Sequence, residues 1–151
     1  MEARLTLARV FISLRDNNRA AQQLTTLLAA DPQNPDANYL LGALLITEEK
    51  YPAAIPYLDR AGQALPDSWA LAFYRGKAAL KTGHPTDAIP LLQRSVELNP
   101  DGQQTYYLLA QALRADGRPA EAKAALDQLR TVKSHALQRE QHALADIPPA
   151  R

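Results

Sequence analysis

The sequence repeats itself with a spacing of 34 residues. At this spacing, four columns hold residues of matched size: a proline column, an alanine column, a leucine column and a column of very small residues. The members of these columns are Pro32, Pro66 and Pro100; Ala20, Ala54, Ala88 and Ala122; Leu24, Leu58, Leu92 and Leu126; and Ala8, Gly42, Gly76 and Ala110. A period of this length with fixed small, large and proline positions is typical of stacked helix–turn–helix units. We therefore expect an all-α solenoid in which each unit buries its apolar face against its neighbours.

Residues within the repeats also follow the helical spacing i, i+3, i+4 and i+7, which marks a buried face. The stripes expected to be buried are Arg4, Leu7, Ala8 and Phe11 in the first repeat, Asn38, Leu41, Gly42 and Leu45 in the second, and Tyr106, Leu109, Ala110 and Leu113 in the fourth. Polar residues 15–18 separate the two helices of the first repeat, and an asparagine there can take the left-handed conformation that ends a helix. Gly83 before Pro85, and Gly117 before Pro119, predict equivalent turns.

The third repeat departs from this pattern at two positions. Arg75 stands where a leucine is expected, and Ala79 replaces a larger residue. A small side chain leaves space in a contact between helices, and protein interiors are normally filled. We therefore expect looser packing in this repeat, with Trp69 and Phe73 supplying compensating bulk.

The columns resemble those of the tetratricopeptide repeat family from Met1 to about Ala136. The resemblance implies a right-handed α-solenoid of four repeats, at residues 1–34, 35–68, 69–102 and 103–136. Ser134 occupies the column that holds proline in earlier repeats, so the last helix is expected to continue. Residues 137–147 are predicted to form a C-terminal capping helix or an extension of the last helix, with Leu137 covering the fourth repeat, and residues 148–151 a disordered tail. Because Met1 falls at the first position of a repeat, we expect a fragment of a longer protein or a mature domain.

Composition and motifs argue against several classes of function. The net charge of +1, from 17 basic and 16 acidic residues, argues against a general nucleic-acid binder, which needs a basic excess to contact phosphates. The chain has no cysteine, no stretch typical of a signal peptide and no apolar run long enough to span a membrane. Its histidines lack the spacing of metal ligands on one helix, and no nucleotide-binding or catalytic motif occurs. We therefore expect no enzyme activity, no catalytic residues, no metal and no cofactor.

The resemblance implies that the first helix of each repeat lines a concave groove through repeat positions 2, 5, 9, 12 and 13. In this chain those positions place aromatic side chains beside cationic ones. The residues expected to contact a partner are Leu5, Arg9, Ile12, Tyr39, Ile46, Phe73, Lys77, Lys81, Tyr107, Gln111 and Arg114. Taken singly, each is better explained as a packing residue or as a complement to a helix dipole. Taken together, aromatic anchors beside cations on one face favour binding.

A ladder of apolar side chains is expected along the groove floor, formed by Leu5, Tyr39, Phe73 and Tyr107. Such a ladder suits the apolar side chains of an extended or helical segment. Lys77, Lys81 and Arg114 have no acidic companion at the groove positions, so the preferred ligand is a protein or peptide that combines apolar anchors with acidic residues. Two other functions stay open. The chain could be an accessory segment of a larger enzyme or of a secretion or assembly protein, or a solenoid that oligomerises through its open N-terminal edge.

Overall fold

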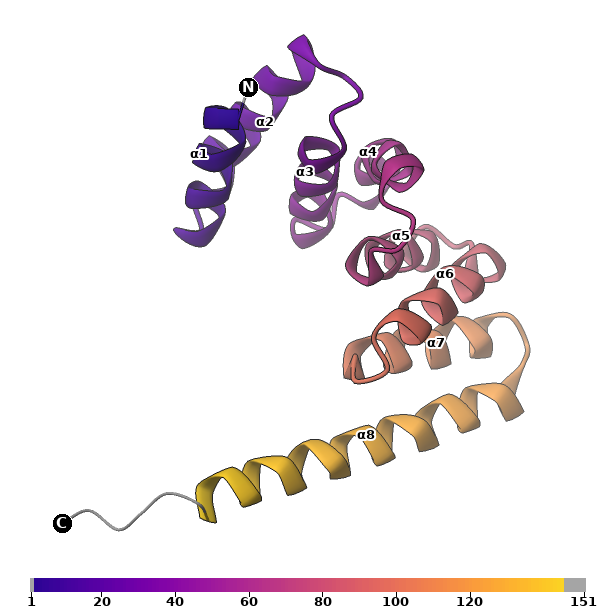
Figure 1. The fold of residues 1–151 in the computed structure, drawn as a ribbon. Coiled ribbons are helices and arrows are strands. Elements are labelled where there is room, and N and C mark those ends of the chain that lie inside the picture. The colour runs from indigo at the N-terminus through magenta and orange to yellow at the C-terminus, as the bar shows by residue number, and fades with distance from the viewer. Residues whose placement is uncertain (1, 146–151) are drawn as a thin grey trace, which may run out of the picture.

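The computed structural model describes residues 2–145, and within this range the chain forms eight α-helices and no strand (Figure 1). The helices are α1 (Glu2–Ser13), α2 (Asn17–Ala30), α3 (Pro35–Thr47), α4 (Tyr51–Ala64), α5 (Trp69–Lys81), α6 (Pro85–Leu98), α7 (Gln103–Ala115) and α8 (Pro119–Ala145). Each helix packs on the next one along the chain, so helix pairs stack in sequence order. The expected all-α, right-handed solenoid is confirmed.

The curvature of the solenoid follows from an asymmetry between the two helices of each pair. The first helices of neighbouring pairs touch, since α3 contacts α5 and α5 contacts α7. Among the described residues, no two second helices (α2, α4, α6 and α8) make comparable contacts. The first helices therefore line the inner, concave side, and the second helices stand further apart on the outer, convex side. In Figure 1 the chain accordingly curves between α1 and α8.

Capping side chains, prolines and left-handed residues mark where the helices begin and end. The side chain of Asn34 accepts a hydrogen bond from the Ala37 backbone N–H at 3.0 Å, and Pro35 takes the first helical position of α3. A left-handed residue follows the first helix of every pair, always in the same repeat column: Arg15, Glu49, Gly83 and Gly117. The glycine turns are as predicted. The asparagine expected in the first turn is wrong, because the left-handed residue there is an arginine, and Asn17 already belongs to α2.

The buried stripes predicted for the second and fourth repeats are confirmed, with Leu45 only partly buried. The stripe of the first repeat is half wrong, because Arg4 and Leu7 are exposed. Leu7 occupies the repeat column of Leu41, which packs against α2, the second helix of the preceding repeat. In the described residues, α1 has no such neighbour.

Only one of the two bulky residues expected to fill the third repeat is inside. Phe73 is buried, whereas Trp69 is 45 % exposed. Arg75 does not enter the core either, because it turns to Asp59 on α4, and its Nη2 lies 2.8 Å from Oδ1. Gly62 on α4 leaves room for this guanidinium, since a Cβ there would lie 3.1 Å from Arg75 Nη1.

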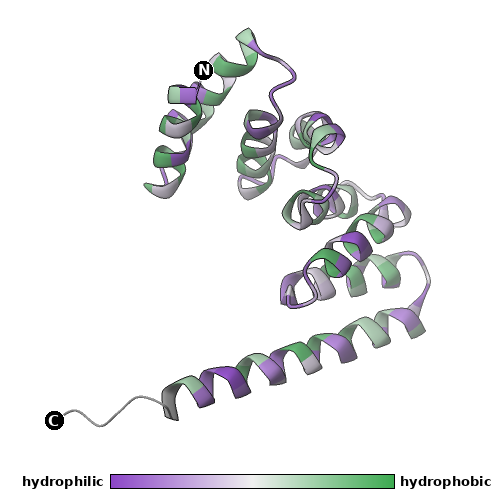
Figure 2. Cartoon of the chain, in the orientation of Figure 1, coloured by the Kyte–Doolittle hydropathy of each residue, from purple (hydrophilic) through white to green (hydrophobic). Residues whose placement is uncertain are grey.

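Helix α8 continues past the fourth repeat without a break. It runs from Pro119 to Ala145, antiparallel to α7 and past the start of that helix (Figure 1). Leu137 is 55 % exposed, so the expectation that it covers the fourth repeat is wrong. The face of α8 that borders Asp101 carries His135, Gln138 and Arg139, and Leu137 lies on the opposite face. Figure 2 shows mainly hydrophilic residues along the C-terminal half of the helix. Arg139 ties it to Asp101 at 3.0 Å. The tail predicted at residues 148–151 lies outside the described residues.

We expect substitution of Gly76 by leucine to overpack the contact between α5 and α6. A Cβ at Gly76 would already lie 2.6 Å from Leu92 Cγ, closer than such atoms approach in proteins. The cost in the free energy of unfolding should be roughly 1–3 kcal/mol or more, measured by urea denaturation. As a control, Gly62→Ala meets only the flexible end of Arg75 and should not destabilise the fold. An unchanged denaturation midpoint for Gly76→Leu would contradict the packing described here.

A second expectation concerns the projecting part of α8. Ending the chain after Lys133 removes side chains that are mostly exposed, together with one exposed ion pair. Exposed pairs contribute about 0–1 kcal/mol, so the melting temperature should change little while the helical circular-dichroism signal falls. Ending the chain after Gln128 is the matched comparison, because it also removes the buried Leu129 and Val132 and should lower the melting temperature clearly. A large destabilisation by the shorter deletion would show that the projection supports the repeats.

Candidate partner-binding groove

The inner side of the solenoid contains a hollow of about 500 Å³ near its N-terminal end. Its lining includes Ile12 from α1, Tyr39, Ala43 and Thr47 from α3, and Tyr74 from α5. We call it the tyrosine hollow, because the rings of Tyr39 and Tyr74 lie side by side with their centroids 6.1 Å apart. It draws on three successive repeats, so its shape depends on how these repeats stack.

Two tyrosines shape the tyrosine hollow, and Arg15 in the turn after α1 is the one charged residue of its lining. Burial raises the pKa of Tyr39 above its ordinary value of 10.0, and the neighbouring Tyr74 adds to this rise. The Tyr39 hydroxyl therefore remains protonated at neutral pH, where it can donate or accept a hydrogen bond. Two aromatic rings with polar tips, set around an alanine and an isoleucine, suit an apolar side chain that enters beside a polar backbone.

A smaller hollow of about 230 Å³ lies further along, between α5 and the start of α7. Trp69, Ala70, Phe73 and Tyr74 line one side of it, and Gln103 and Gln104 line the other. Tyr74 therefore borders both hollows and separates them. Its ring meets that of Phe73 edge-on, with centroids 5.4 Å apart.

Charge is distributed unevenly along the first helices. Arg9 on α1 pairs with Asp36 on α3 at 3.4 Å, which leaves Arg15 as the one cation in the lining of the tyrosine hollow. No acidic group of the described residues forms an ion pair with Lys77 or Lys81 on α5 or with Arg114 on α7. Lys77 and Lys81 stand one helical turn apart. The C-terminal part of the concave side, with these three cations, therefore carries most of the uncompensated positive charge.

The structure separates the predicted contact residues into three groups. Ile12 and Tyr39 line the tyrosine hollow, and Phe73 shows an edge in the smaller hollow while most of its ring packs in the core. Arg9, Lys81, Tyr107 and Arg114 are exposed, and Leu5, Lys77 and Gln111 are half-buried. Ile46 is a correction, because it is 1 % exposed among Ala54, Leu58 and Leu71 and cannot touch a partner.

The predicted ladder of Leu5, Tyr39, Phe73 and Tyr107 is therefore not a continuous accessible row. The most prominent residue that the prediction missed is Tyr74. It occupies the repeat position directly after Phe73, which the groove positions of the family omit. The available signal was the Phe73–Tyr74 pair, since two adjacent aromatic residues on one helix cannot both point into the same core.

Other kinds of site are not evident in the described part of the chain. No group of three or more His, Asp or Glu side chains there is placed to hold a metal ion. None of the helices within residues 2–145 has the length and apolar character needed to cross a membrane.

A tetratricopeptide repeat family model matches residues 5–68 and again residues 73–136. The chain belongs to this family. Solved structures with the same fold include a crystal structure of MamA, at TM-score 0.81 and 20% identity over 91% of this chain and 80% of that one. MamA from Desulfovibrio magneticus RS-1 gives a TM-score of 0.80 at 20% identity over 89% of this chain and 76% of that one. No curated protein sequence matches the chain. Tetratricopeptide repeats are typically non-catalytic protein-interaction modules, and the chain is a protein-binding module of this family.

Proposed function

We propose that the protein recognises a segment of a partner protein in its concave groove, without catalysis. The segment places an apolar side chain in the tyrosine hollow and acidic side chains against Lys77, Lys81 and Arg114. The tyrosine hollow is the observation that carries this proposal, because it is concave, largely apolar and formed by three repeats, with a single charged residue, Arg15, in its lining. Binding sites in proteins typically combine these properties with a few polar groups that orient the ligand.

The energies of the two kinds of contact indicate that the apolar anchor supplies affinity and the cations guide association. Burying one leucine- or phenylalanine-sized side chain contributes about 1.5–3 kcal/mol, so the hollow can supply the anchor of a moderate-affinity complex. The cations on α5 and α7 are exposed or half-buried, so their pairs with acidic groups are screened by salt and contribute little affinity. Their main effect is on the rate and selectivity of encounter.

Peptides selected from a random library on the immobilised chain test the groove. We expect the selected sequences to combine a large apolar residue with acidic residues. Tyr39→Ala should raise the dissociation rate of such a peptide about tenfold or more, because truncating a buried anchor acts mainly on dissociation. Lys77→Glu together with Arg114→Glu should slow association at low salt, and high salt should reduce the difference. Surface plasmon resonance measures both rates.

Two control variants separate the groove from general effects. Tyr57→Ala removes another half-buried tyrosine, on the second helix α4, and should leave both rates unchanged. Lys123→Glu together with Lys133→Glu makes the same change in net charge on α8. Peptides that respond equally to the groove variants and to these controls would contradict the proposal.

A second candidate function is self-association through the N-terminal edge. On α1, Leu7, Val10 and Leu14 are 41, 45 and 68 % exposed. The residues 34 positions after the first two, Leu41 and Leu44, are buried in a cluster with residues of α2. An apolar stripe that is covered in the second repeat and bare in the first favours a partner surface at this edge.

Light scattering over a concentration series tests self-association. We expect the mass of the chain to rise toward that of a dimer, and Val10→Glu with Leu14→Glu to keep it monomeric, because a carboxylate buried in an apolar contact is unfavourable. Leu137→Glu places the same charge at an exposed leucine on α8 and should not change the association. A wild-type chain that stays monomeric at the highest concentration would rule this function out.

A further inference from the structure

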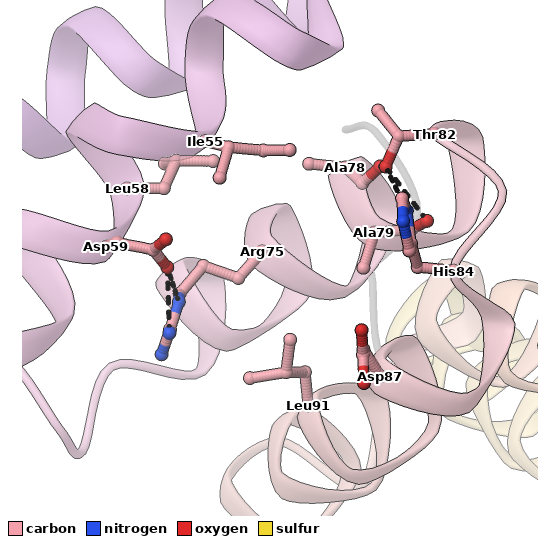
Figure 3. A pocket seen from close by; sticks show the side chains of 10 residues that line it. All are labelled: Ile55, Leu58, Asp59, Arg75, Ala78, Ala79, Thr82, His84, Asp87 and Leu91. Atoms are coloured by element: carbon pink, nitrogen blue, oxygen red, sulfur yellow. Dashed lines mark hydrogen bonds and ion pairs between the residues drawn. The ribbon is translucent and has the colours of Figure 1, made fainter.

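The outer side of the solenoid has a hollow of its own, bordered by α4, α5 and α6 (Figure 3). Its volume is about 300 Å³. Leu58 from α4, Ala78 and Ala79 from α5 and Leu91 from α6 contribute apolar surface. We call it the outer hollow. It lies on the side of α5 that faces the second helices, so it is separate from the concave groove.

The outer hollow exists because two side chains that fill the same place in other repeats are absent. Leu45 in the second repeat and Leu113 in the fourth occupy the column of Ala79, and both pack against core clusters. The column of Arg75 holds leucine in those repeats as well, at positions 41 and 109. Arg75 turns out of the space to reach Asp59, donating from Nε at 3.0 Å. The missing leucine atoms leave an apolar floor uncovered.

The charges around the outer hollow are unbalanced. Asp59 on the α4 side is neutralised by Arg75. Asp87 lies on the other side, at the first turn of α6, and Figure 3 shows it away from the Asp59–Arg75 pair. Asp87 is exposed to solvent, and its side chain forms no ion pair with another described residue. Thr82 and His84 nearby bond to each other, with Oγ1 and Nδ1 3.2 Å apart. The hollow therefore pairs an apolar floor with one carboxylate that has no cation.

We propose that the outer hollow is a second protein-contact site, which receives an arginine side chain from a partner protein. The aliphatic stem of the arginine lies on Leu58, Ala79 and Leu91, and its guanidinium bonds to Asp87. Arginine side chains bury their stems on apolar surface while the charged group meets a carboxylate in a planar, two-point contact. This site goes beyond the proposed groove function and does not depend on it.

Other occupants fit less well. An acidic side chain would meet Asp87 and the already paired Asp59, and like charges repel. A purely apolar side chain would cover Asp87 without giving it a partner, which is unfavourable for a carboxylate. The alkyl stem of an arginine covers the apolar floor of the hollow, and its guanidinium pairs with Asp87.

Methyl NMR on the full chain, with n-butylguanidinium as the probe, tests the site. The probe carries the stem and head of arginine and nothing else, so we expect saturable shifts at the methyls of Ala78, Ala79 and Leu91 at millimolar concentration. n-Butanol and butyrate are the matched neutral and anionic probes, and should give much smaller shifts. Equal shifts for all three probes, or none for butylguanidinium, would overturn the proposal.

Two variants of the chain sharpen the test. Asp87→Asn should weaken binding of butylguanidinium roughly tenfold, because a charge-assisted pair becomes a neutral contact. Asp127→Asn, on α8, is the control. Ala79→Leu copies the residue found at Leu45 and Leu113 and fills the hollow, so it should abolish the shifts without lowering the melting temperature. Binding that survives both Asp87→Asn and Ala79→Leu would show that the probe lies elsewhere.

Discussion

The contact between the first and second helix of each repeat is the interaction on which the solenoid depends. In the second and third repeats this contact is close because glycine faces leucine: a Cβ at Gly42 would lie 2.5 Å from Leu58 Cδ2, and one at Gly76 would lie 2.6 Å from Leu92 Cγ. Alanine holds the same column at Ala8 and Ala110. Close approach of the two helices lets the leucine of the second helix fill the space beneath the first. Each pair thereby becomes a unit with its apolar surface already arranged for the next one.

Both candidate sites arise from the stacking of these units rather than from any single helix. At two junctions an apolar side chain of the second helix meets a leucine of the next first helix: Leu28 clusters with Leu41, and Val96 with Leu109. At the middle junction the same two columns hold Gly62 and Arg75. This exchange opens the outer hollow. The aromatic pair of Tyr39 and Tyr74 spans the same junction on the inner side and shapes the groove.

Features that follow from the residues of one repeat could be predicted from the sequence. Features that follow from how several repeats stack could not. The 34-residue columns correctly predicted the helix pairs, the buried stripes of the second and fourth repeats and the glycine turns, because these follow from local spacing. Ile46 and Tyr74 were misjudged because the direction of a side chain near the edge of a stripe depends on how the next repeat is rotated. Leu137 was misjudged for a related reason. Which face of the extended α8 borders the fourth repeat depends on how the helix is rotated, and the spacing of its apolar residues does not fix that rotation.

The contact between first helices, and the gaps between second helices, also determine how the solenoid can bend. The first helices act as the hinge of any bending motion, because α3, α5 and α7 already touch on the inner side. Any change in curvature must therefore widen or narrow the gaps on the outer edge by more than it moves the groove wall. The size of the side chains in those gaps limits how far the gaps can close. These side chains are leucine at positions 45 and 113, and alanine at position 79. The smallest of these side chains, Ala79, lies on α5, the helix that also carries Tyr74. The width of the groove at Tyr74 is therefore set by packing on the opposite face of the molecule.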